Sequence, residues 1–260
     1  MIEKLKSGIS AALLRCGLDV RRTSQVPFGL HWFRDIQFFP NGAGLETVFD
    51  VGANIGQTAG TIVRHFPRSR VYSFEPVPST FQELVRQTTK HPNVEPLCRA
   101  LGEIRGLVPM TVVPLSGSNT LLAAGLDANG KPRVQVQVDT VESFCRERAI
   151  HHISLLKIDT EGYEMKVLQG AKDLLANGRV DFVLAECDFL RRNEEPHGDF
   201  VEIFSYLSAF GFQVVSFYTG GVDDLGWVWG DALFRQVRGC NPGRVSGSPF
   251  RRKQAAVRTL

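Results

Sequence analysis

The sequence predicts an α/β fold built around a mainly parallel β-sheet, and three observations support this class. Short apolar segments of strand length alternate with segments of about 10–15 residues that have helical periodicity, a pattern typical of βαβ units. The longest apolar runs, such as residues 182–185, are too short to span a membrane. Of the 260 residues, 43% are hydrophobic and 22% charged, which suits one globular domain with short extensions.

We expect each strand or helix to end where its apolar pattern stops at a glycine, a proline or an acid. Strands of the main sheet are predicted at 47–51, 70–74, 94–98, 153–158, 180–185, 212–218 and 228–235. Helices are predicted at 56–66, 79–89, 163–176 and 199–210. The helix at 79–89 is expected to begin with Ser79 as its cap. Segments 107–113 and 133–138 are predicted to be strands that pair with each other or with the sheet edge, and the last two main strands to form an antiparallel edge hairpin.

The chain divides into an N-terminal lead-in (1–44), a domain (45–236) and a basic tail (237–260). Apolar residues at helical spacing predict a short amphipathic helix in the lead-in, which either docks on the domain or makes a weak, peripheral membrane contact. The net charge of +3 depends on the tail, because residues 241–260 hold five basic and no acidic residues. The remaining residues carry 25 basic and 27 acidic side chains, so we expect no nucleic-acid partner and no fixed structure in the tail.

Five scattered cysteines, none in a C-x-x-C pair, argue against a disulfide framework or a zinc ribbon. The N-terminus also lacks a long apolar segment followed by a convincing cleavage site. We therefore predict a cytoplasmic protein.

The most informative motif is the loop DVGANIGQT, which follows the first predicted strand and opens a helix. In a doubly wound sheet, a nucleotide-like ligand binds at this position. Gly52 allows backbone and ligand to approach closely, and Gly56 lets the helix start tight against the strand. Asn54 replaces the middle glycine of the dinucleotide fingerprint, and Asp50 would repel a pyrophosphate. Asp50 suits a cationic ammonium group, such as that of S-adenosylmethionine.

Glu75 indicates the same ligand. It ends the second predicted strand, where a carboxylate can accept hydrogen bonds from both ribose hydroxyls of a bound nucleoside. Strand, glycine loop, helix, strand and acid follow one another in the order that a cofactor site requires.

A second group of acids follows two later strands. Asp159 ends the strand LLKI, Glu161 comes two residues later, and Glu186 ends the strand VLAE. Because parallel strands end at one edge of a sheet, these three carboxylates are expected to face the cofactor loop.

The segments VFDVGANIGQT, SFEPVPSTF and LLKIDTEGYEMKVLQGA resemble the FkbM-type family of S-adenosylmethionine-dependent methyltransferases over roughly residues 45–218. The resemblance implies a Rossmann-like class I methyltransferase fold with a mainly parallel seven-stranded sheet. It implies methylation of hydroxyl oxygens on sugars or polyketides. It assigns Asp50, Gly52, Asn54, Gly56 and Glu75 to the cofactor site. Asp159, Glu161 and Gly162 belong to the substrate-side loop, and 99–103 resembles the stretch near the adenine.

The chemistry leaves three roles open for the acids at 159, 161 and 186. A sugar hydroxyl is a poor nucleophile, so Asp159 or Glu161 could accept its proton as the catalytic base. The three acids could instead bind Mg²⁺, for which carboxylate oxygens are suitable ligands. In a purely structural role, Glu161 would cap the next helix or pair with Lys157 or Lys166. His197 is a reserve base.

We expect an O-methyltransferase acting on a saccharide or glycolipid. The alternatives are an enzyme for a polyketide or other small metabolite, a binding module without catalytic activity, and a dehydrogenase, which Asp50 and Asn54 disfavour. Trp227 and Trp229 either stack on a sugar or pack on the sheet edge. The sequence does not determine the acceptor or the oligomeric state.

Overall fold

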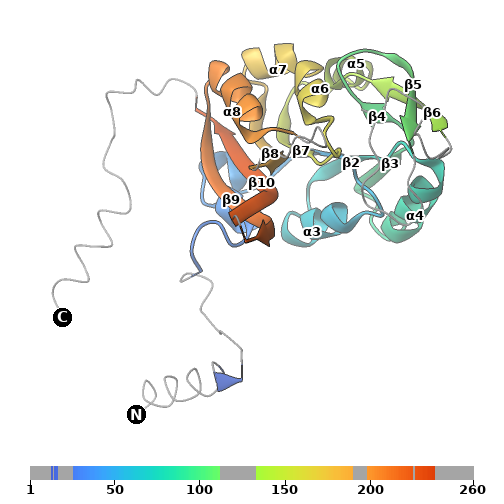
Figure 1. Ribbon diagram of the computed structural model, residues 1–260. Coiled ribbons are helices and arrows are strands. Elements are labelled where there is room, and N and C mark those ends of the chain that lie inside the picture. The colour runs from blue at the N-terminus through green and yellow to red at the C-terminus, as the bar shows by residue number, and fades with distance from the viewer. Residues whose placement is uncertain are drawn as a thin grey trace, which may run out of the picture.

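The computed structural model describes residues 26–111, 133–189, 198–224 and 226–237, together with Leu13, Arg15 and Cys16. The tail beyond Val237, His197 and nearly all of the predicted N-terminal helix lie outside these residues. The centre of the molecule is a seven-stranded sheet with the order β3-β2-β1-β7-β8-β10-β9 (Figure 1). Its strands are β1 (Thr47–Val51), β2 (Arg70–Phe74), β3 (Val94–Leu97), β7 (Ile153–Ile158), β8 (Val180–Asp188), β9 (Phe212–Asp223) and β10 (Gly226–Gln236).

Strands β3, β2, β1, β7 and β8 run parallel, and β10 runs antiparallel to both of its neighbours, β8 and β9. The predicted mainly parallel sheet with an antiparallel edge hairpin is therefore confirmed. The hairpin strands are longer than predicted, because β9 continues to Asp223 and β10 begins at Gly226.

A second sheet of three strands contains the segments for which two pairings were open. β5 (Gly106–Thr111) and β6 (Arg133–Asp139) pair antiparallel with each other, and β4 (Ala100–Leu101) adds to β6 in parallel. These strands do not extend the main sheet. They lie beside it, and β4 supplies part of the wall of the cavity described below.

Helices cover both faces of the main sheet. One face packs against α2 (Trp32–Gln37) and α3 (Gln57–His65), with Val48, Leu155 and Phe182 pointing to that side. The opposite face packs against α5 to α8, whose bounds are α5 (Val141–Glu147), α6 (Glu164–Gln169), α7 (Lys172–Ala176) and α8 (Phe200–Ala209). Among the described residues, no helix is long and apolar enough to cross a membrane.

The helices differ from the sequence prediction in three places. Helix α4 (Pro78–Thr88) begins at a proline with Val77 as N-cap, so the prediction of Ser79 as the cap was wrong. The single helix predicted at 163–176 is two helices, since a Cβ on Gly170 would lie 2.0 Å from the carbonyl oxygen of Gly102. That close approach interrupts the helix. Helices α2 and α5 and the 3-10 turn η2 (Pro40–Gly42) were not predicted.

The register of the sheet brings three loops to the same level. Val51 at the end of β1 is paired with Phe74 of β2 on one side and Ile158 of β7 on the other. Gly52, Glu75 and Asp159 are the next residues of these strands, so the two predicted groups of functional residues begin side by side at the carboxyl edge.

Candidate active site

A cavity of about 250 Å³ opens at the carboxyl edge of the main sheet. The loops after β1, β2 and β7, the end of β8, and strands β4, β5 and β10 contribute to its wall. The residues that line it are Val51, Gly52, Asn54, Phe74, Glu75, Pro76, Thr80, Ala100, Leu101, Met110, Asp159, Thr160, Glu161, Tyr163, Glu186 and Trp229. Most sequence-predicted site residues therefore meet at one cavity, and the loosely matched stretch at 99–103 contributes Ala100 and Leu101.

Gly52 joins the two loops of the site. Its backbone is left-handed, with φ 78°, and a Cβ would lie 1.7 Å from the carbonyl oxygen of Asp159. The amides of Gly52 and Ala53 donate to the carbonyl oxygen of Phe74 at 3.1 and 2.9 Å. Gly52 was predicted to make room for a ligand. It lines the cavity, but the group that requires a glycine here is the backbone of the β7 loop.

Asn54 and Gly56 shape the rest of the first loop. Asn54 has a left-handed backbone with φ 49°, which asparagine tolerates better than most residues. Gly56, with φ 96°, caps α3, and its Cβ would lie 3.0 Å from Cδ1 of Leu84 in α4. Asn54 lines the cavity, whereas Gly56 packs behind it and acts through the shape of the loop.

Glu75 is a buried carboxylate that lines the cavity and is held by two backbone amides. Its Oε2 accepts from the amide of Asn54 at 3.1 Å, and its Oε1 accepts from the amide of Val77 at 2.9 Å. Burial raises the pKa of Glu75 to about 7. A carboxylate oxygen accepts more than one hydrogen bond, so Glu75 can also accept from a pair of hydroxyl groups.

The contact of Asp50 with an ammonium group stays a prediction, and the structure places this side chain away from the cavity wall. Its side chain is fully buried below the loop and does not line the cavity. Lys157 is its ionic neighbour, with 3.7 Å between Nζ and Oδ1. The same Nζ donates to Oδ2 of Asp159 at 2.9 Å. Asp50 lies two residues after Val48 on β1, so both side chains point to the α3 face of the sheet. Asp50 therefore belongs to a buried charge network beneath the site.

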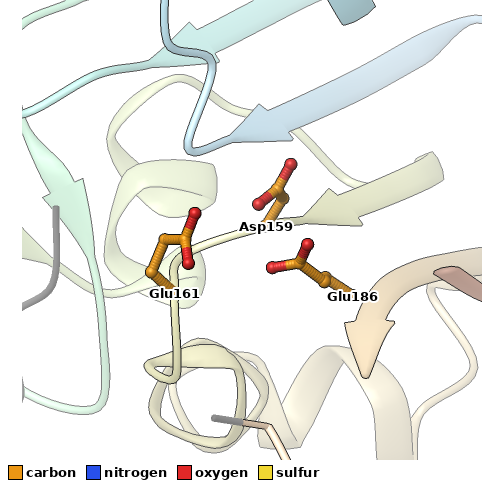
Figure 2. Close-up of side chains that lie close together, drawn as sticks. All are labelled: Asp159, Glu161 and Glu186. Carbon is orange, nitrogen blue, oxygen red and sulfur yellow. The ribbon is translucent and has the colours of Figure 1, made fainter. Parts of the chain in front are cut away.

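The three predicted acids come together at the cavity. One carboxylate oxygen from each of Asp159, Glu161 and Glu186 lies within 4.8 Å of the others. Figure 2 shows the three carboxylates converging from the end of β7, the following loop and strand β8. Burial, together with the charges of Asp159 and Glu161, raises the pKa of Glu186 to about 9. This concentration of negative charge favours a bound cation or a proton.

Glu164 fixes the loop that carries Glu161. Its Oε1 accepts from the amide and hydroxyl of Thr160, at 2.8 and 3.0 Å, and from the amide of Gly162 at 3.2 Å. Glu161 between them has a left-handed backbone, φ 53°, which is uncommon for a glutamate and typical of constrained functional sites. The loop thus holds the Glu161 side chain at the cavity wall.

The structural role of Glu161 stays a prediction, and other acids pair with the two lysines that it named. No side chain caps α6, whose N-cap residue is Tyr163. Lys157 pairs with Asp159, and Lys166 pairs with Glu103 at 2.8 Å. The acid that organises the turn is Glu164.

Residues 50–214 match the family described as the methyltransferase FkbM domain. The chain belongs to the FkbM methyltransferase family. It is an S-adenosylmethionine-dependent methyltransferase with a Rossmann-like class I fold, as the sequence predicted.

Three curated relatives of this FkbM-family chain are named as methyltransferases. Methyltransferase 1 of Beauveria bassiana is 29% identical over 69% of this chain and 76% of its own length. The 31-O-demethyl-FK506 methyltransferase FkbM of Streptomyces tacrolimicus is 28% identical over 71% of this chain and 80% of its own. The hexuronic acid methyltransferase AglP of Haloferax volcanii is 25% identical over 54% of this chain and 55% of its own.

Solved structures with a similar fold include an O-methyltransferase family protein from Burkholderia thailandensis. The match has a TM-score of 0.47 and 11% identity, and it covers 80% of this chain and 55% of that one. Aeropyrum pernix fibrillarin in complex with S-adenosyl-L-methionine matches with a TM-score of 0.43 and 15% identity, over 73% of this chain and 66% of that one.

Three residues of this FkbM-family site were not predicted to belong to it. Lys157 and Glu164 lie within the recognised KIDTEGYE segment, but their partners depend on the folded loop. Asp231 of β10 lies directly opposite Glu186 in the antiparallel pairing with β8, and burial raises the pKa of Asp231 to about 6. The strand alternation along ISLLKI places Lys157 on the face of Leu155, which was an available signal.

Proposed function

We propose that this enzyme transfers the methyl group of S-adenosylmethionine to a hydroxyl of a saccharide or glycolipid acceptor. The observation that supports this best is the convergence of three carboxylates beside the cavity that also contains Glu75. Acids at this place suit the removal of a proton from a hydroxyl, which must become a better nucleophile for methyl transfer. The relative named as a hexuronic acid methyltransferase supports a sugar acceptor.

In this proposal Glu75 accepts hydrogen bonds from the two ribose hydroxyls. The apolar side chains of Phe74, Leu101 and Met110 provide a surface for the adenine. The cofactor supplies the methyl group as an electrophile when it is bound. Asp159 and Glu161 provide negative charge for its cationic end, a role that Asp50, buried below, does not fill directly.

We expect Glu75→Ala to weaken S-adenosylmethionine binding by at least about 30–100-fold, because even one hydrogen bond to a charged group contributes about 1.5–3 kcal/mol. Glu75→Gln should cost about tenfold. Wild-type affinity should rise as pH increases through about 7, since the raised pKa keeps Glu75 partly protonated below that value. The Glu75→Gln variant should lose this pH dependence. Calorimetry between pH 5.5 and 8.5 measures both effects.

Glu95→Gln is the matched control, because Glu95 of β3 pairs with Arg70 and Arg148 and does not line the cavity. The control should bind the cofactor like the wild type. If Glu75→Ala binds with unchanged affinity, Glu75 does not contact the ribose.

We assign the base role to Glu161. Its left-handed backbone and the hydrogen bonds of Glu164 hold it at the cavity wall, whereas Asp159 has one oxygen engaged by Lys157. In this arrangement Glu161 takes the proton of the acceptor hydroxyl, and Asp159 and Lys157 orient the loop.

Binding of Mg²⁺ is the other use that the same acids allow. Asp159, Glu161 and Glu186 would hold the ion through carboxylate oxygens, and its charge would make the acceptor hydroxyl easier to deprotonate. Under this alternative, millimolar Mg²⁺ raises the unfolding temperature of the protein alone, and Glu186→Gln abolishes that rise. Transfer that survives EDTA removes the metal role and leaves the base role intact.

An acceptor screen with radiolabelled S-adenosylmethionine tests the proposal. We expect label in saccharides or lipid-linked sugars, in a product stable to mild base, as an ether is. Label only in polyketides or other small metabolites would support the second candidate, which the FkbM relative named for a demethyl-FK506 substrate favours. No transfer to any acceptor by a protein that binds the cofactor would indicate an inactive binding module.

The domain limits 45–236 and the cytoplasmic location are part of the same proposal. Limited proteolysis followed by mass spectrometry tests the first, and fractionation of the source cells tests the second. The matched region 50–214 falls within the proposed domain.

A further inference from the structure

Trp229 of β10 lies flat against two glycines of the neighbouring strand. A Cβ on Gly220 would lie 2.0 Å from ring carbons Cε3 and Cζ3 of Trp229, and a Cβ on Gly221 would lie 2.4 Å from its Nε1. Any side chain at these two positions of β9 would occupy the space of the indole. The pair of glycines therefore forms a shelf for the ring.

Two register shifts surround this residue. Pairing between β10 and β9 moves from Trp227↔Val222 to Trp229↔Gly221 and then to Gly230↔Thr219. Val228 on β10 and Gly220 on β9 are thus left out of the ladder. Bulges of this kind occur next to active sites, where they change the direction of a side chain. Here they place the indole at the end of the hairpin beside the cavity.

The free side of the ring faces the proposed acceptor region. Trp229 lines the cavity together with Glu161 and Glu186, and 44% of its surface is exposed. One face of the indole rests on the glycines, so the exposed area belongs to the other face and to the edges. A tryptophan with one face packed and the other at a cavity wall has apolar ring surface available for a ligand.

We infer that Trp229 is a specificity-determining residue that stacks on the apolar face of a pyranose acceptor. This inference rests on the proposed function, because it names what positions the sugar for transfer. The C–H groups on one face of a pyranose are apolar while its hydroxyls point outward around the ring. Stacking on Trp229 would cover that face and leave the hydroxyls at the rim to reach Glu161.

The sequence left stacking and packing open for Trp229. One face of the ring packs on the glycine shelf, and the proposal assigns stacking to the other face. A rigid ring with two torsions loses little conformational entropy on binding, which makes it an effective platform. The acids alone would attract any polar or cationic group. An aromatic surface beside them selects acceptors that combine hydroxyls with a flat apolar face.

Steady-state kinetics with a methylated saccharide from the acceptor screen test this inference. We expect Trp229→Ala to raise KM for the saccharide at least tenfold, with kcat changed less than threefold and the cofactor Kd unchanged. Trp229→Phe should give an intermediate KM. Gly220→Ala keeps the tryptophan but displaces its ring, so it should raise KM in the same way.

Phe38→Ala is the matched control, because Phe38 is an exposed aromatic residue, at 52%, that follows α2 and does not line the cavity. Its KM should equal that of the wild type. An unchanged KM in Trp229→Ala, or an equal loss of cofactor affinity, would overturn the stacking role. Failure of the proposed function has a different signature, because the wild type itself would then transfer no label to any saccharide.

Discussion

Replacing Lys157 by methionine is expected to lower the free energy of unfolding by about 3–5 kcal/mol, because it leaves the fully buried Asp50 and the partly exposed Asp159 without their cation. Lys157 is only 5% exposed and lies 2.9 Å from Asp159 and 3.7 Å from Asp50. Burial alone would lower the pKa of Lys157, but the charges of Asp159 and Asp50 outweigh it and raise that pKa. The ammonium is therefore charged throughout the range in which the enzyme would be assayed.

Methionine keeps most of the length and apolar surface of the lysine, so the loss measures the charge and not a cavity. Urea unfolding at pH 7.5 gives the free energy directly. Adding Asp50→Asn to Lys157→Met should restore part of the loss, because one of the stranded charges is then removed. Because the pKa of Lys157 is raised in the folded protein, its ion pairs stabilise the fold at neutral pH. This stabilisation is lost only as pH rises above the ordinary lysine range.

Lys166→Met serves as the control, because Lys166 makes a half-exposed pair with Glu103 at 2.8 Å. Exposed pairs of this kind contribute about 0–1 kcal/mol, so its unfolding free energy should change little. Equal losses in the two variants would mean that Lys157 does not neutralise the acids beneath the site.

The residues at the ends of strands were predictable, because a strand end is marked in the sequence. Asp159 directly follows β7, as predicted, whereas Glu186 was expected to end its strand and lies two residues before the end of β8 at Asp188. A parallel sheet still brings both residues to one edge. Pairing of Val51 with both Phe74 and Ile158 makes this edge level. The same argument predicted that Glu75 would lie beside the glycine loop.

Contacts between side chains on the same face were less predictable, because they require a register that the sequence does not state. Asp50 was expected at the ligand, yet strand alternation turns it to the α3 face, where Lys157 also points. Asp231 comes 45 residues after Glu186 in the chain and joins the acids only because β10 pairs antiparallel with β8. The break at Gly170 likewise depends on the distant Gly102.

Replacing Glu161 by glutamine is expected to lower kcat by about 10²–10⁴-fold, the range that a positioned base contributes. Glutamine retains the size of glutamate but cannot take the proton of the acceptor hydroxyl. Asp159→Asn should also lower kcat, and it should in addition reduce stability, because Lys157 loses its 2.9 Å partner. Single-turnover transfer of labelled methyl, with saturating cofactor and acceptor, separates the chemical step from binding.

Glu83→Gln, a surface acid of α4 that pairs with Arg86, is the control for these two variants and should retain full activity. Activity unaffected by both Glu161→Gln and Asp159→Asn would exclude the base and metal roles together. If either variant loses activity, the effect of EDTA on the wild-type enzyme distinguishes a base from a metal site. A base acts without added Mg²⁺, so Glu161→Gln lowers an activity that EDTA leaves unchanged in the wild type. A metal site needs all three acids, so Glu186→Gln would cost as much as Glu161→Gln, and excess Mg²⁺ would restore part of either loss.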